Sequence, residues 1–167
     1  PFCAARKKDC ASICSRCYAD TTVRRYSALN KNMERNSEIL TARLLELDEL
    51  PMINAAIFRF EAFGDLINAT QARNYIRLAK VNPHTMFALW TKNPGILAQA
   101  IAAEGKPENM VVLLSSHIIG QQADASRWEF VDKTFTVYRK EDMPEDMINC
   151  GSRQCLTCRR CYSHDTE

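Results

Sequence analysis

Eight cysteines are the residues of this chain whose type and spacing could support chemistry, and all of them lie near its two ends. The 167-residue sequence contains no cysteine between residues 18 and 149. The N-terminal group is Cys3, Cys10, Cys14 and Cys17, and the C-terminal group is Cys150, Cys155, Cys158 and Cys161. Each group ends in a C-x2-C step, in which a short loop lets two sulfurs converge on one ion or cluster. The pattern therefore predicts two four-thiolate metal sites, with all eight cysteines as ligands.

A disulfide framework is the alternative interpretation of so many cysteines. Disulfide-rich proteins are usually shorter and spread their bridges along the chain, because their cores are small. Here the long middle of the chain has no cysteine, and an apolar fraction of 46% is ordinary for a domain that builds its core without bridges. We therefore expect free thiols in a reducing, cytoplasmic compartment.

The identity of the metal stays open between iron–sulfur clusters and zinc, since both are bound by four thiolates. The stretch from Cys10 to Cys17 has the spacing C-x3-C-x2-C, whereas zinc sites more often use paired C-x2-C or C-x4-C steps. This spacing favours two [4Fe–4S] clusters. Two sites of either kind would change the formal net charge from +2 to about −2, which disfavours a nucleic-acid partner.

Alternating helical and strand patterns fill the cysteine-free middle of the chain. Apolar residues at helical spacing from Met33 to Leu47 predict a helix that Pro51 ends. Further helices are predicted after Asn68 or Thr70 and from Pro94 to Gly105. Strands are predicted at 53–60, 85–90, 110–114 and 130–138. The alternation predicts a parallel sheet, and because a complete barrel needs more than ~200 residues, we expect a partial, open β/α barrel.

The predicted organisation is a single α/β domain over residues 1–167. Residues 1–20 form an N-terminal cluster loop, residues 21–140 form the β/α core, and residues 141–167 form a C-terminal cysteine-rich tail. No apolar run approaches the ~18 residues that a membrane span needs, so no membrane association is expected.

Polar residues follow the predicted strands at the points where those strands end. In parallel sheets, ligands bind beyond the carboxyl ends of the strands, and the N-terminal cysteines come just before the first helix. The sequence therefore predicts a pocket at this edge of the sheet. Its residues are Glu61, Gly64, Asp65, Thr91, Lys92, Asn93, Ser115, Ser116, His117 and Arg139.

The C-x3-C-x2-C motif followed by alternating helices and strands resembles the radical S-adenosylmethionine (SAM) superfamily. The resemblance implies that three thiolates hold a [4Fe–4S] cluster, and that the fourth iron binds the amino and carboxylate groups of SAM before SAM is cleaved to a radical. It further implies that Gly64 and Asp65 receive the SAM amino group, and that Arg59 and Lys92 hold SAM or substrate. If Cys3 supplies a fourth thiolate, no iron is open and this chemistry is blocked.

The layout is also similar to a short cysteine-rich bacteriophage family catalogued as gene product eighty-eight. The similarity lies in an early cysteine run that ends in Cys-Tyr-Ala, a central Phe-Arg and Gly-Asp segment, and a cysteine-rich end. The matching residues are Cys3, Cys10, Cys14, Cys17-Tyr18-Ala19, Phe58-Arg59, Gly64-Asp65 and Thr91-Lys92. No activity follows from this second resemblance.

The sequence thus predicts an iron–sulfur protein that binds two [4Fe–4S] clusters on a radical-SAM-like core, with SAM or a reductant protein as a partner. Whether the protein is an enzyme stays open. The alternative is a non-catalytic binding module, stabilised by zinc or iron–sulfur clusters, that acts on a protein or nucleic acid. Basic residues near both cysteine groups favour that alternative, although they also serve to balance thiolate charge. His164, three residues after Cys161, is not expected to be a metal ligand.

Overall fold

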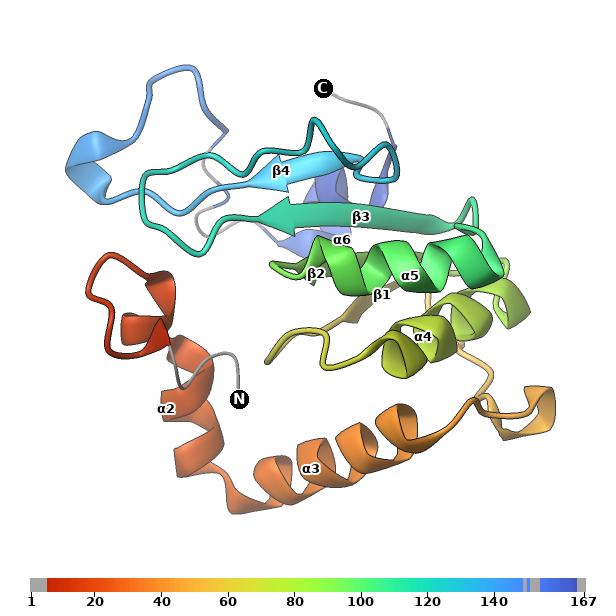
Figure 1. The fold of residues 1–167 in the computed structure, drawn as a ribbon. Coiled ribbons are helices and arrows are strands. Elements are labelled where there is room, and N and C mark those ends of the chain that lie inside the picture. The colour runs from red at the N-terminus through yellow and green to blue at the C-terminus, as the bar shows by residue number, and fades with distance from the viewer. Residues whose placement is uncertain (1–5, 149, 151–153, 165–167) are drawn as a thin grey trace.

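The computed structural model describes residues 6–148, 150 and 154–164, so Cys3 lies outside the described residues. A four-stranded sheet with the order β1-β2-β3-β4 forms the centre of the fold (Figure 1), and all neighbouring strands are parallel. The strands are β1 (Ile57–Phe60), β2 (Met86–Thr91), β3 (Met110–Ser115) and β4 (Lys133–Phe135). The predicted parallel α/β architecture is therefore confirmed.

Two crossover helices cover one face of this sheet, and they begin and end at local signals in the sequence (Figure 1). The Asn68 side chain caps α4 (Ala69–Val81) by accepting a hydrogen bond from the Gln71 backbone N–H at 2.9 Å. Pro94 opens α5 (Pro94–Glu104), and Gly105 ends it with a left-handed φ of 72°. The N-terminal helices are α2 (Tyr18–Arg25) and α3 (Ser27–Ala42), and a short α6 (Cys155–Cys158) lies in the tail. The 3-10 turns are η1 (Ile13–Arg16), η2 (Leu47–Glu49), η3 (Lys140–Asp142) and η4 (Arg160–Tyr162).

The core has two parts because successive side chains in a strand point to opposite faces of the sheet. Phe58, Phe60, Phe87, Leu89, Met110 and Val112 pack with the helices on one face. Ile57, Met86, Ala88, Trp90, Val111 and Leu113 pack on the other face around Tyr162 from the tail. Every residue of β3 is buried, which is typical of a central strand that is covered on both sides.

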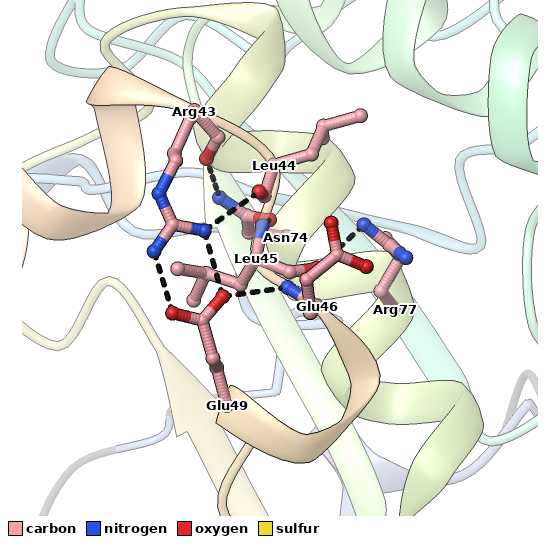
Figure 2. A network of polar contacts seen from close by, with 7 residues as sticks. All are labelled: Arg43, Leu44, Leu45, Glu46, Glu49, Asn74 and Arg77. Atoms are coloured by element: carbon pink, nitrogen blue, oxygen red, sulfur yellow. Dashed lines mark hydrogen bonds and ion pairs between the residues drawn. The ribbon is translucent and has the colours of Figure 1, made fainter.

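Asn74, a buried asparagine of α4, joins α4 to the C-terminal end of α3 (Figure 2). Asn74 is 1% exposed, and its side chain accepts from the Leu45 N–H and donates to the carbonyls of Leu40 and Arg43. Outside this buried contact, the Arg43 guanidinium donates to both carboxylate oxygens of Glu49. One amide side chain thereby satisfies three backbone groups where the chain leaves α3.

The structure differs from the sequence predictions in several elements. The sheet is open, as predicted, but the described strands do not show the predicted partial barrel. β1 starts at Ile57 rather than residue 53, because the Ile53 N–H donates to the Asn82 side chain and the Ile53 carbonyl accepts from Thr85. The predicted strand at 130–138 is reduced to three residues, and α2 was not predicted. In the described part of the chain, no helix is long and apolar enough to cross a membrane.

Candidate functional site

The N-terminal cysteine loop is fixed to the carboxyl end of the sheet, where the strands point toward it in Figure 1. Ser12 forms an isolated antiparallel bridge with Ile118, just after β3. The Ile13 N–H donates to the His117 carbonyl at 2.8 Å, and the Ile119 N–H donates to the Ala11 carbonyl at 2.9 Å. These backbone bonds hold the loop at the edge where parallel sheets bind ligands.

The three described cysteines of this loop differ in exposure. Cys10 is exposed, Cys14 is 6% exposed, and Cys17 is half-buried. The Ser12 hydroxyl accepts from the Cys14 N–H at 3.2 Å and so caps the 3-10 turn η1 that carries Cys14. Cys17 stands at the start of α2. The C-x3-C-x2-C spacing therefore corresponds to a capped turn followed directly by a helix.

The loop also reaches the end of β1 through the residue that follows its last cysteine. The Tyr18 hydroxyl donates to the Ala62 carbonyl at 2.9 Å, and its ring lies 5.8 Å from the ring of Phe63. Residues 11–18 thus contact the segments after both β1 and β3. We define the carboxyl edge as this loop together with the segments that follow β1, β2 and β3.

Three of the four residues assigned to SAM or substrate, Gly64, Asp65 and Lys92, lie at the carboxyl edge. Asp65 Oδ1 accepts from the Thr91 hydroxyl at 2.7 Å, and Oδ2 accepts from the Lys92 N–H at 3.0 Å. Both oxygens of Asp65 therefore tie the segment after β1 to the end of β2. This contact positions the edge and occupies lone pairs that a bound amino group would use.

Arg59, the fourth assigned residue, lies on the sheet face that the tail covers. Its guanidinium carbon is 4.0 Å from the centroid of the Trp90 ring, a cation–π geometry. The Trp90 ring meets that of Tyr162 edge-on at 6.5 Å. Burial and the charges of Cys155 and Cys161 raise the pKa of Tyr162, and the charge of Arg59 opposes them.

Glu61 was predicted only as one of the strand-end residues, and the structure gives it contacts that the sequence did not reveal. It follows β1 directly and has a left-handed φ of 51°, which is uncommon for a residue other than glycine. Burial raises the pKa of its carboxyl to about 7, and the charge of Asp65 adds to this effect. No sequence pattern marks these contacts of Glu61, because its partners, Gln71 and Tyr75, are ten and fourteen residues away on α4.

His117 lies at the carboxyl edge after β3 and faces positive charge. Burial lowers the pKa of its imidazole, and the charges of Arg6 and Lys92 act in the same direction. Asp9 opposes them. The neutral imidazole is therefore favoured at this position, beside the carbonyl that anchors the cysteine loop.

Three of the tail cysteines, Cys155, Cys158 and Cys161, lie on a short helix and the turn that follows it. Cys155 and Cys158 are the ends of α6, and Arg159 reverses the chain in a left-handed conformation with a φ of 53°. Burial raises the pKa of the Cys161 thiol, and the charges of Cys150, Cys155 and Cys158 raise it further. A thiolate at any one of these positions therefore disfavours a thiolate at Cys161 unless a cation compensates for the charge.

The tail is attached to the sheet by a buried tyrosine and by polar contacts. Tyr162 is 8% exposed, and Lys133 of β4 donates to the Arg160 carbonyl at 2.7 Å. His164 Nδ1 lies 2.9 Å from an Asp132 carboxylate oxygen, and its Nε2 lies 2.7 Å from the Glu108 carbonyl. Both ring nitrogens of His164 therefore face an oxygen atom. With both ring nitrogens occupied in this way, His164 anchors the tail.

The chemistry of the donors fits a thiolate metal centre. All described cysteines are free thiols, and thiolates are the ligands of zinc and of iron–sulfur clusters. Among the described residues, no three His, Cys, Asp or Glu side chains have converged into a metal-binding group. The tail thiols interact by charge at longer range, so metal binding would require the turn to close further around the ion or cluster.

Comparison with known protein families identifies a match over nearly the whole chain. A family model described as Gene product 88 matches residues 1–164, which associates the chain with bacteriophages. No curated protein and no solved structure matches the chain. The resemblance to the radical SAM superfamily is not supported by these comparisons.

Proposed function

We propose that this chain, which belongs to the gene product 88 family, is an iron–sulfur protein with two [4Fe–4S] sites. Cys10, Cys14 and Cys17, together with Cys3 outside the described residues, would form the N-terminal centre. The tail centre would be formed by Cys150, Cys155, Cys158 and Cys161. The proposal assigns every cysteine of the chain to a ligand role.

The observation that carries the proposal is the mutual electrostatic effect of the four tail cysteines. The thiol of Cys161 is half-buried, and the charges of all three other tail cysteines act on it. Thiols whose charges act on one another in this way repel when they ionise, and a bound cation removes that repulsion. Leu156 of α6 is 67% exposed and Tyr162 is the buried anchor of the tail, so a bound metal would add to the stabilisation that Tyr162 provides.

The two centres would differ in role because they lie at different places on the sheet. The N-terminal loop lies at the carboxyl edge, which is the position suited to a ligand-binding centre. The tail packs on the sheet face opposite α4 and α5, which suits a structural or electron-transfer centre. Arg59 would offset the negative charge of the tail centre, as cations near ligating sulfurs do.

SAM is the ligand that we propose for the N-terminal centre if Cys3 leaves one iron open. A low-potential reductant protein would then be the electron donor. Support for this part comes from the C-x3-C-x2-C spacing and from the position of the loop at the carboxyl edge. Asp65 would act there chiefly by positioning, since both of its oxygens accept hydrogen bonds from the end of β2.

The test is anaerobic purification from iron-replete cells, followed by quantitation of iron, acid-labile sulfide and zinc. Electron paramagnetic resonance (EPR) of the reduced protein, with and without SAM, then separates the two centres. We expect about eight irons per chain, a signal lost in Cys14→Ser, and a second signal lost in Cys158→Ser. Ser15→Ala is the matched control in the loop and should keep both signals.

Each outcome of this test decides between the proposed roles. A signal that shifts when SAM is added supports an open iron in the N-terminal centre. Two signals that ignore SAM support four-thiolate ligation and an electron-transfer role. Stoichiometric zinc without sulfide refutes the iron–sulfur proposal and favours the binding-module alternative.

A further inference from the structure

The positive charge of this protein is gathered in its first 35 residues, although the formal net charge of the whole chain is only +2. Residues 1–35 contain eight of the 22 Lys and Arg residues but only three of the 20 Asp and Glu residues. The rest of the chain is therefore net acidic. The distribution of charge, rather than its total, indicates where an anionic partner would bind.

Most of these basic side chains are not neutralised by the protein itself. Lys7 and Arg24 share the carboxylate of Asp20, at 2.6 and 3.1 Å. Five others are exposed and form no ion pair with the described residues, namely Lys8, Arg16, Arg25, Lys31 and Arg35. The charges of these five side chains are therefore available to a partner.

Balance of thiolate charge does not account for the basic residues that lie farthest from the cysteines. Figure 1 shows α2 leading away from the cysteine loop and α3 running on from its far end. Arg25 is the last residue of α2, and Lys31 and Arg35 lie one turn apart in α3, on the same side of that helix. Neither helix contains a buried residue, so all of their side chains reach solvent.

The exposed aromatic side chains of the described chain lie in the same segment. Tyr18 is 63% exposed at the start of α2, and Tyr26 is 56% exposed between α2 and α3. Every other aromatic side chain that the structure describes is buried or half-buried. The two tyrosines thus bracket Arg24 and Arg25 in the sequence. Proteins that bind single-stranded nucleic acid combine exposed rings, on which bases stack, with cations that contact the phosphates.

We propose that α2 and the first half of α3 form a binding surface for single-stranded nucleic acid. Arg25, Lys31 and Arg35 contact phosphates, and the ring of Tyr26 stacks on a base. Tyr18 continues the surface toward the carboxyl edge, where its hydroxyl donates to the Ala62 carbonyl at 2.9 Å. None of these residues is a proposed metal ligand, so the inference does not depend on the iron–sulfur proposal.

Two other anionic partners fit this surface less well. A helix that lies on a membrane needs a face of large apolar side chains. Besides the two tyrosines, the only large apolar side chain exposed on α2 and α3 is Ile39. Duplex DNA keeps its bases stacked on one another, so the exposed rings would meet no unstacked base. The rings therefore favour a single strand.

The experiment is a fluorescence anisotropy titration of the full chain with a labelled oligothymidylate, at salt concentrations between about 50 and 200 mM. Each phosphate contact on a single strand contributes about −0.7 to the slope of log K against log salt, so three contacts predict about −2. Lys31→Ala/Arg35→Ala removes two of these contacts and should leave a slope of about −0.7. Alanine keeps both positions helical. Arg127→Ala/Lys140→Ala removes two exposed charges outside the surface and should keep the slope of the wild type.

Tyr26 tests the stacking contact separately from the charges. Tyr26→Ala should weaken binding about tenfold, because one base loses the ring on which it stacks. The salt slope should stay that of the wild type, since no phosphate contact is lost. Tyr26→Phe keeps the ring and should bind like the wild type.

The inference is overturned if the wild type does not bind oligothymidylate at the lowest salt concentration. It is also overturned if the two double variants lose the same part of the slope, or if Tyr26→Ala binds as tightly as the wild type. Binding to vesicles that contain anionic lipid, without binding to the oligonucleotide, would refute it in favour of a membrane surface. Iron is quantified in the same samples, and its absence would refute the proposed function without affecting this inference.

Discussion

Replacing Glu61 by glutamine should stabilise the fold in a pH-dependent way, independently of any metal. The carboxyl has a pKa of about 7 in the folded protein against an ordinary value of 4.5. At about 1.4 kcal/mol per pH unit, this difference corresponds to about 3 kcal/mol of stability that ionisation of Glu61 removes at high pH. Glutamine has the same shape, and its amide oxygen can accept the hydrogen bonds from Tyr75 and Gln71.

The direction of this pH dependence follows from whether the folded or the unfolded protein binds the proton of Glu61 more tightly. Because the folded-state pKa of Glu61 is raised, the folded protein keeps a proton that the unfolded chain releases above pH 4.5. The contribution of Glu61 to stability is therefore most favourable below pH 4.5. It declines as the pH rises to about 7, and it is constant at higher pH. In Glu61→Gln this decline is absent.

The assay is urea unfolding of metal-free wild type and Glu61→Gln at pH 5.5, 7 and 8.5 under reducing conditions. Other titrating groups cancel in the comparison, so the stability gap should widen by about 2 kcal/mol between pH 5.5 and 8.5 in favour of the variant. Glu34→Gln, an exposed carboxylate on α3, is the control and should show a constant gap. A gap between wild type and Glu61→Gln that does not change with pH would refute the account of this buried carboxyl.

Four other variants test the remaining anchors of the fold and the proposed metal ligands. Asn74→Leu should lower the free energy of unfolding by about 3 kcal/mol, because three backbone groups lose their partner. Arg43→Ala, which removes the exposed contacts of Arg43 with Glu49 and with the Leu44 carbonyl, should lower it much less by the same urea titration. His164→Ala should loosen the tail and speed iodoacetamide labelling of Cys161 in the metal-free protein about fivefold, as a loss of about 1 kcal/mol implies; an unchanged rate contradicts the anchoring role. Cys158→Ser should halve the iron content to about four atoms per chain, and full iron content in this variant contradicts the two-site assignment.

Much of the fold could be predicted from the sequence because its signals are local. Asn68 caps α4, Pro94 opens α5 and Gly105 ends it, and each of these residues acts within one helical turn. The errors occurred where distant side chains decide the structure. Residues 53–56 are apolar enough for a strand, yet Asn82 and Thr85 bind Ile53 and prevent pairing there.

The candidate site was predicted only in outline for the same reason. Cysteine spacing along the chain predicts which thiols belong together, but not that Tyr18 would join their loop to the segment after β1. The sequence also grouped Arg59 with Asp65, whereas the alternation of β1 turns Arg59 toward Trp90 on the tail-covered face. The contacts of Glu61 depend on its left-handed φ, and a glutamate in the sequence does not predict such a backbone angle.

The covering of the sheet's second face by the tail has a consequence for how the chain is made. Val111 and Leu113 are buried on that face beneath Tyr162, but Tyr162 leaves the ribosome only after every strand has emerged. Until then an apolar surface stays open to neighbouring chains, and such surfaces promote aggregation. Newly made protein is therefore most exposed to aggregation during the interval between synthesis of β4 and docking of Tyr162.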